Sequence, residues 1–109
     1  MKNWRTLEVE NEILLRARNE WIERTSDSFG PDELEEIYVC ECGDLKCSEN
    51  VSLTRAEYEV VRSDGGHFVV AVDHENPEIE FVTFENGRFT IVQKMMAAGR
   101  MSQETNPRR

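Results

Sequence analysis

Three cysteines fall within eight residues of this 109-residue chain, at Cys40, Cys42 and Cys47. Scattered core cysteines would rarely lie so close in sequence, so we expect the three thiols to be neighbours in the fold. The segment from Glu36 to Cys42 is rich in β-branched and aromatic residues, which predicts a strand, and side chains two apart on a strand share a face. Gly43 permits a tight turn that brings Cys47 back toward the other two cysteines. The pattern therefore predicts three thiolates that converge on one point.

Three convergent thiolates are typical of a structural zinc site, which takes four tetrahedral ligands and often includes a histidine. The chain has two histidines. His74 lies in a polar loop after a predicted strand, from which its side chain can reach another loop, and His67 lies at the other end of that strand. We therefore predict a zinc site at Cys40, Cys42, Cys47 and His74, with His67 as the alternative fourth ligand. In the competing interpretation the cysteines are small core residues and His74 is solvated at a turn.

Two further functions are open to the same cluster. In a thiol redox sensor, oxidation of Cys40 or Cys42 would release the metal; the odd number of cysteines argues only against a structural disulfide framework. In a zinc hydrolase, the three cysteines would hold the ion and Glu41 or Glu75 would be the general base. No H-E-x-x-H or deaminase motif accompanies the cluster, and three thiolates make zinc a poor Lewis acid. An enzyme is therefore the least favoured of these functions.

A long amphipathic helix is predicted from Trp4 to about Thr25, because this stretch contains neither Gly nor Pro. We expect its apolar face to pack on the domain or on a second copy of the chain. That face carries Trp4, Leu7, Leu14, Leu15, Trp21 and Ile22. The polar residues Glu12, Arg16 and Asn19 are expected to face solvent.

The rest of the chain predicts an α+β domain. A capping box at Thr54 and Glu57 starts a short helix, and the Asn-Gly pair at 86–87 joins two strand patterns as a hairpin. With the strand that begins at His67, these give a three-stranded antiparallel β-meander. We therefore predict one zinc-binding domain over residues 1–94, built from the long N-terminal helix, a zinc knuckle, the short helix and the meander. Residues 95–109 are predicted to be a flexible tail.

Composition limits the partners of this domain. The chain has 22 acidic and 13 basic residues and a formal net charge of −9, which disfavours binding to nucleic acids or to anionic membrane surfaces. It has no apolar run of about 18 residues and no signal-peptide pattern, so we expect a cytoplasmic protein. The partners that remain are another protein or a second copy of this chain, and the predicted role is that of a small zinc-stabilised interaction or regulatory module.

Several short motifs combine into a longer pattern. They are Val39-Cys40-Glu41-Cys42-Gly43 with Cys47, Leu53-Thr54, Glu57-Tyr58, Val61-Arg62, Phe68-Val69-Val70 and His74-Glu75. Together they resemble a group of small uncharacterised actinobacterial proteins with a pattern close to CECG-x-x-x-C, LT-x-x-EY-x-x-VR and F-x-V-x-x-x-HE. The resemblance implies His74 as the fourth ligand, because His74 occupies the HE position, and it implies no particular reaction. This chain has Val72-Asp73 where the group usually has Pro-Gly before that histidine.

Overall fold

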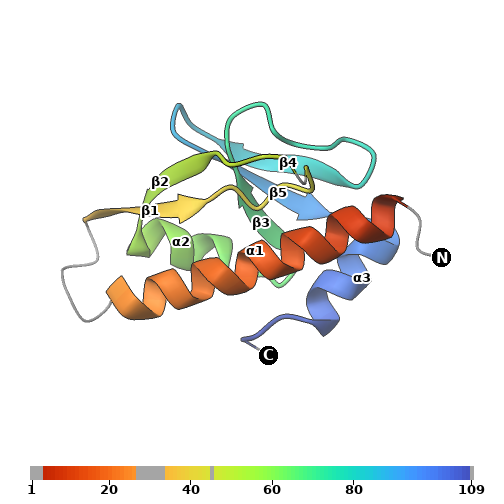
Figure 1. Cartoon of the computed structure of the whole chain (residues 1–109), viewed down its shortest axis with the longest axis horizontal. Helices are drawn as coiled ribbons and strands as arrows, with labels where there is room; N and C mark the ends of the chain where they lie inside the picture. The colour runs from red at the N-terminus through yellow and green to blue at the C-terminus, as the bar shows by residue number, and fades with distance from the viewer. Residues whose placement is uncertain (1–3, 27–33, 45, 109) are drawn as a thin grey trace.

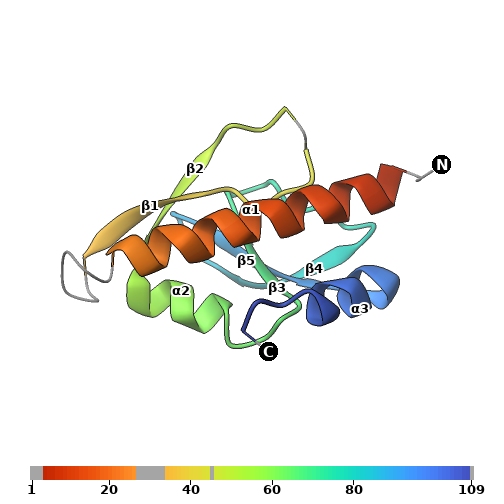
Figure 2. The same ribbon diagram turned by 60° about the horizontal axis from the view of Figure 1, so that its bottom comes forward.

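The fold is α+β, with a long N-terminal helix and antiparallel sheets, as predicted (Figure 1). The structure, a computed structural model, describes residues 4–26, 34–44 and 46–108. Its elements, in chain order, are α1 (Trp4–Ser26), β1 (Glu35–Val39), β2 (Asn50–Thr54), α2 (Arg55–Val61), β3 (His67–Val70), β4 (Glu80–Glu85), β5 (Thr90–Lys94) and α3 (Met96–Glu104). Helix α1 runs along the length of the molecule, with α2 beside one end and α3 beside the other (Figures 1 and 2).

The strands form two antiparallel sheets, β1-β2 and β3-β5-β4. The second sheet is therefore not a meander, because β5 rather than β4 occupies its centre. On β5, Val92 lies opposite Phe68 of β3 and Val82 of β4. Strand β5 is almost wholly buried whereas β4 is exposed from its second residue onward. The more buried strand thus takes the central position, and the connection over residues 71–79 carries β4 to the far edge.

The predicted capping box is present at the start of α2. The Glu57 amide donates to Thr54 Oγ1 over 3.1 Å, and the Thr54 amide donates to Glu57 Oε1 over 2.8 Å. These two bonds satisfy donors that a helix N-terminus otherwise leaves free. Leu53 and Tyr58, on either side of the cap, are fully buried, and the Tyr58 ring stacks on Tyr38 at 4.6 Å between centroids. The short second helix is therefore confirmed and is anchored in the core.

The apolar core consists of two clusters that meet at Ala71. The larger cluster surrounds Tyr38 and Tyr58. The smaller one combines Cys40 and Cys42 with apolar side chains of the three-stranded sheet, namely Phe68, Val70 and Val92. Two of the cysteines therefore lie at the edge of the hydrophobic core and not in a surface loop.

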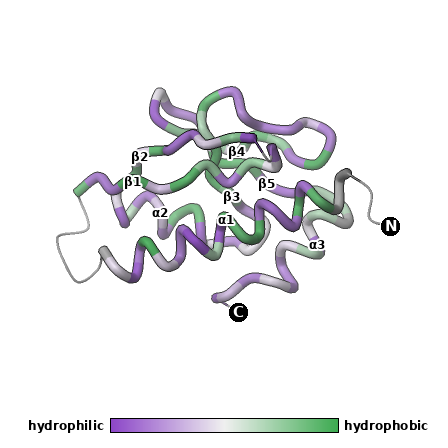
Figure 3. Tube along the Cα trace, viewed as in Figure 1, coloured by the Kyte–Doolittle hydropathy of each residue, from purple (hydrophilic) through white to green (hydrophobic). Residues whose placement is uncertain are grey.

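Helix α1 packs on the domain with the face opposite to the one predicted. Leu14 is 70% exposed and Trp21 is 61% exposed, whereas Glu12 and Asn19 are fully buried and Arg16 is 1% exposed. Leu7 is also exposed, while half-buried Ile22 contacts the larger core cluster; the side chain of Trp4 lies outside the described part of the chain. Polar and apolar residues alternate along this helix (Figure 3).

The reason for the inversion is that the domain offers polar groups to α1. Arg16 Nη1 donates to the Gly65 carbonyl over 2.7 Å, and Glu12 forms a buried ion pair with Lys94. Polar side chains can be buried only where the fold offers them hydrogen bonds or ion pairs, and here backbone carbonyls and a lysine do so.

Helix α3 corrects the prediction of a flexible tail after residue 94. It spans Met96–Glu104, and its Ser102 is fully buried, with the carbonyl of Ser102 accepting a hydrogen bond from Arg16 over 3.1 Å. No side chain caps its N-terminus. Its anchoring contact therefore comes from α1, far away in sequence, and local sequence gives no sign of it.

Among the described residues, no helix combines the length and the apolar composition that a membrane span requires.

Candidate metal centre

Two loops carry the four predicted ligands, which we call the metal centre: Cys40, Cys42, Cys47 and His74. The three cysteines lie between β1 and β2, and His74 follows β3. The Cys40 amide donates to the Glu49 carbonyl over 3.1 Å and closes the first loop, while the His74 amide donates to the Ala71 carbonyl over 3.0 Å and turns the second. Local backbone hydrogen bonds therefore fix both loops.

The four ligand atoms lie within 4.8 Å of one another. Nδ1 of His74 is 3.6 Å from Cys40 Sγ and 3.5 Å from Cys47 Sγ. Cys40 and Cys42 are buried, and Cys47 and His74 are half-buried. All three cysteines are free thiols. The predicted gathering of these side chains is thus present, and the cluster can hold a metal ion.

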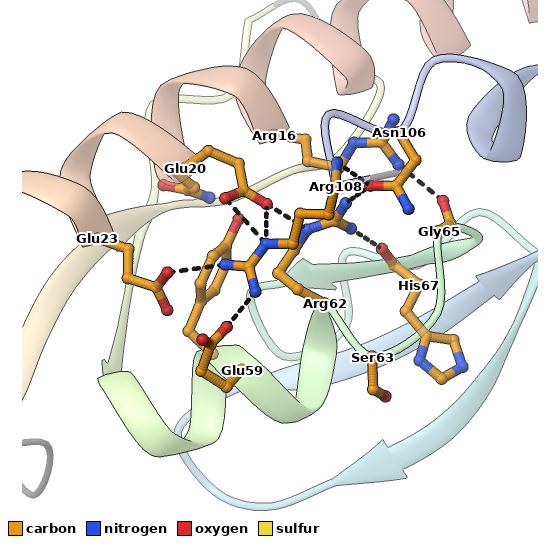
Figure 4. Close-up of polar contacts among 12 residues, drawn as sticks. Arg16, Glu20, Glu23, Glu59, Arg62, Ser63, Gly65, His67, Asn106 and Arg108 are labelled. Atoms are coloured by element: carbon orange, nitrogen blue, oxygen red, sulfur yellow. Dashed lines mark hydrogen bonds and ion pairs between the residues drawn. The ribbon is translucent and has the colours of Figure 1, made fainter.

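His67, the alternative ligand, lies elsewhere. Its side chain lies near Ser63 (Figure 4), and it belongs to no group of candidate ligands among the described residues. The reason is the length of β3, which separates the two histidines and places them at opposite ends of one strand.

The thiols interact strongly with one another. Hydrogen bonding to Cys40 lowers the pKa of Cys42 to about 5, with a smaller contribution from His74, and the same bond raises the pKa of Cys40. The Ala71 amide donates to Cys40 Sγ over 3.1 Å. Amide and thiol donors of this kind stabilise thiolates, which is the form that binds metals.

Glu41 separates the two buried cysteines and points the other way, into the core. One of its carboxylate oxygens accepts from Asn19 Nδ2 over 2.7 Å and from the Tyr58 hydroxyl over 3.3 Å, and the other accepts from the Val69 amide over 2.9 Å. Burial raises its pKa. Glu41 is therefore an internal anchor that fixes which face of the segment the cysteines occupy, and it is not available as a general base at the metal centre.

Asn19 is a second anchor that sequence reasoning missed. Its Nδ2 donates to the Val39 carbonyl over 2.9 Å and its Oδ1 accepts from the Val39 amide over 2.8 Å. One side chain of α1 thus satisfies both backbone groups of the residue that precedes Cys40. The only sequence signal was a polar stripe with helical spacing, which is also the pattern of a solvated helix face.

Gly43 is required by close packing of α1 against the cysteine loop. A Cβ atom at Gly43 would lie 2.7 Å from the Cβ atom of Glu8 on α1. Its φ is not positive, so its role is to admit the helix and not to form a left-handed turn. Any larger residue would push the loop away from the helix.

Asp73, directly before His74, has a φ of 70°. This left-handed conformation is uncommon for residues other than Gly, with Asp and Asn among the better tolerated. The loop therefore keeps the backbone shape that a glycine would adopt without strain and so delivers His74 to the cysteines.

A cavity of about 280 Å³ opens beside the metal centre. Cys42 and His74 contribute to its wall, together with acidic side chains that include Glu8, Asp44 and Glu75. Acidic walls raise the local concentration of cations. The cavity thus gives an ion a path to the cluster from solvent.

Comparison with known proteins gives no relatives for this chain: no family model, no curated protein and no solved structure matches it.

Proposed function

We propose that the metal centre binds one zinc ion, which ties the cysteine loop to the histidine loop. The observation that carries the proposal is the pair of distances from His74 Nδ1, 3.6 Å to Cys40 Sγ and 3.5 Å to Cys47 Sγ. Tetrahedral zinc with the usual bonds to sulfur and nitrogen has a sulfur–nitrogen edge of about 3.5 Å. The donor atoms thus have the separations that an ion between them would require.

The donor set favours zinc among the common metals. Three thiolates and one imidazole are soft and borderline ligands, which disfavour magnesium and calcium. With four protein ligands, a tetrahedral ion has no open position for substrate, so the role we propose is structural. Free thiolates of this kind persist in a reducing compartment, which supports the cytoplasm as the location.

Because a zinc ion with four protein ligands has no open position for a substrate, we propose that the zinc-stabilised domain acts as an interaction or regulatory module. The exposed stripe on α1, formed by Leu7, Leu14 and Trp21, supports this role, since such side chains on a helix often contact a partner. Leu14→Asp tests whether that partner is a second copy. If it is, light scattering of the wild type over a dilution series will give a dimer mass that the variant lacks; a wild type that stays monomeric at high concentration would exclude the dimer.

A thiol redox sensor is the second candidate, and the greater exposure of Cys47 favours it. Hydrogen peroxide would convert one thiolate to a sulfenic acid with loss of hydroxide, and a second thiol would then displace water to form a disulfide. The two lost ligands would release zinc. Mild peroxide that leaves zinc bound would exclude the sensor and retain the structural role.

The direct test is the metal content of protein purified without chelators, measured by native mass spectrometry and elemental analysis. We expect one zinc per chain, and we expect Cys42→Ser and His74→Ala to lose it. His67→Ala is the matched control, because it removes the other histidine and should leave the zinc content unchanged. Substoichiometric metal in the wild type, or equal loss from the two histidine variants, would contradict the proposal.

A further inference from the structure

Three carboxylates on α1 and α2 surround the guanidinium of Arg108 (Figure 4). Arg108 Nε lies 2.9 Å from Oε1 and 3.1 Å from Oε2 of Glu20, and Nη2 lies 2.7 Å from Oε1 of Glu23. Nη1 pairs with Glu59. All three guanidinium nitrogens are therefore bound, each by a different glutamate. We call Glu20, Glu23 and Glu59 the carboxylate cradle.

Contacts other than those with Arg108 also help to position the carboxylate cradle. The side chain of Glu20 is 9% exposed, and its Oε1 also accepts from Arg62 Nε over 2.6 Å, where the Arg62 side chain is fully buried. The Glu23 side chain is 12% exposed, and its Oε2 is buried without a hydrogen-bond donor among the described residues. Arg108 itself is more exposed, at 29%. Two nearly buried carboxylates, one of them with an unused acceptor, thus hold a more accessible cation, and the exposed carboxylate of Glu59 completes the cradle.

The charges in the cradle require a cation. Three carboxylates face the guanidinium groups of Arg62 and Arg108, and the more distant charge of Arg16 also acts on Glu20. Burial, followed by the charge of Glu59, raises the pKa of Glu23 to about 7. Removal of Arg108 would leave three carboxylates with Arg62 alone. The planar fork of a guanidinium matches this set of acceptors better than the point charge of a lysine.

Outside the cradle, the segment that carries Arg108 is held mainly by the side chains of Thr105 and Asn106. It leaves α3 after Glu104 and belongs to no helix or strand. Thr105 Oγ1 accepts from Arg16 over 3.2 Å, and Asn106 Oδ1 accepts from Arg62 and from the Arg108 amide, the latter over 3.2 Å. Short segments of this kind open locally at a small fraction of the free energy of global unfolding. Arg108 can therefore leave the cradle while the rest of the fold stays intact.

We propose that the carboxylate cradle is a binding site for an arginine side chain of a basic partner peptide, and that Arg108 is the internal occupant with which this peptide competes. The net charge of −9 attracts such a peptide from a distance. Arginine is also the anchor residue that protein interfaces use most effectively beside buried carboxylates. This site is separate from the metal centre, and its test does not depend on zinc.

The probe is a fluorescein-labelled, amidated peptide with the sequence of residues 103–108, whose binding is followed by fluorescence anisotropy. Arg108→Ala empties the cradle, so we expect this variant to bind the probe at least tenfold more tightly than the wild type. In the Arg108→Ala background, Glu59→Gln should weaken binding at least fivefold. Glu85→Gln, which removes the same charge from an exposed position at the end of β4, is the matched control and should have no such effect.

A peptide with citrulline in place of arginine keeps the shape of the side chain but removes its charge. It should bind Arg108→Ala at least tenfold more weakly than the arginine peptide does. Equal affinity for the wild type and Arg108→Ala, equal binding of the citrulline peptide, or equal effects of Glu59→Gln and Glu85→Gln would overturn the proposal. A wild-type dimer that dissociates on Arg108→Ala would assign the cradle to a second copy and would also overturn it.

A measurement on the wild type avoids any dependence on the fold of the variant. The Nε–H resonance of Arg108 in ¹⁵N-labelled protein reports its place in the cradle. Excess unlabelled peptide should displace Arg108 and remove the protection of this hydrogen from solvent exchange, whereas the citrulline peptide should not. An Arg108 resonance that is unchanged at millimolar peptide would overturn the proposal.

Discussion

The two halves of the inner face of α1 contact two different kinds of polar cluster. The N-terminal half packs on the metal centre, where Glu8 approaches Gly43 and Asn11 Nδ2 donates to the Cys42 carbonyl over 3.4 Å. The C-terminal half contributes Glu20 and Glu23 to the carboxylate cradle and contacts the arginines around it. At the metal centre the ligand atoms face mainly one another, whereas in the cradle each guanidinium nitrogen of Arg108 already has a carboxylate of the same chain.

The difference shows how a small domain satisfies buried polar groups. A group taken out of water needs a partner, which is either another part of the chain or a bound species. Around Arg62 and Arg108 the chain supplies that partner. At the metal centre it supplies four side chains whose donor atoms face one another and could hold a cation between them.

The largest expected effect separates the two clusters by their dependence on metal. Chelation of zinc, or Cys42→Ser, should lower the free energy of unfolding by at least about 3 kcal/mol, because metal binding and folding are coupled in a small domain. Thermal denaturation followed by circular dichroism measures this loss. His67→Ala, which changes a residue outside the metal centre, is the control variant for Cys42→Ser. An unchanged melting temperature after complete metal removal would show that neither cluster needs a metal for stability, and would contradict the difference proposed between them.

The next effect compares two arginines of the same network. Arg62→Ala should cost about 3 kcal/mol, since it leaves Glu20 as a buried carboxylate without its buried partner. Arg108→Ala should cost about 1 kcal/mol or less, because Arg108 is nearly one-third exposed and solvent screens its ion pairs. Urea denaturation of both variants, with metal present throughout, tests this order. Equal losses would mean that the cradle and the buried pair act as one unit.

A smaller effect concerns pH. Burial raises the pKa of Glu12 from 4.5 to about 8, despite its ion pair with Lys94. A carboxyl group with a raised pKa in the folded state contributes stability below its unfolded pKa and loses that contribution as the pH rises through the folded value. The free energy of unfolding should therefore fall as the pH rises from about 4.5 to about 8 and level off above that, by at least about 1 kcal/mol more in the wild type than in Glu12→Gln. Parallel pH profiles for the two proteins would contradict this assignment.

An effect of similar size tests strain in the histidine loop. Asp73 has a φ of 70°, so Asp73→Gly should relieve strain but add freedom to the unfolded chain, for a net gain of at most about 1 kcal/mol. Asp73→Val, which tolerates this conformation poorly, should lose about 1 to 2 kcal/mol. Chemical denaturation of the zinc-loaded variants gives both values. A loss in Asp73→Gly as large as in Asp73→Val would show that the Asp side chain, and not the backbone, matters.

Sequence patterns were sufficient for features that depend on local chemistry. The capping box at Thr54 and Glu57 acts over one turn of helix, and the cluster of cysteines required only proximity along the chain. His74 was favoured because its loop follows a strand. The capping box and the cysteine cluster depend on spacing within one segment, whereas the contact of His74 with the cysteines joins two loops.

Sequence patterns failed where the decisive partner is distant. The stripe that contains Leu14 and Trp21 predicted the inner face of α1, but the groups that select the face are the Gly65 and Ser102 carbonyls and the ion pair of Lys94. Helix α3 was missed for the same reason, since Arg16 on α1 anchors it. Hydrophobic periodicity shows which residues share the apolar face and which share the polar face of a helix. It does not show which of the two faces the rest of the fold contacts.

The polar inner face of α1 also has a kinetic consequence. Arg16 bonds to residues 49 and 86 positions away in sequence, Gly65 and Ser102, so its side chain has these partners only when the turn before β3 and helix α3 are both in place. Nonspecific collapse rewards apolar surface, and the large apolar side chains Leu14 and Trp21 of α1 are exposed in the native state. The helix should therefore dock after the transition state, and in stopped-flow experiments Arg16→Ala should accelerate unfolding while leaving the folding rate nearly unchanged.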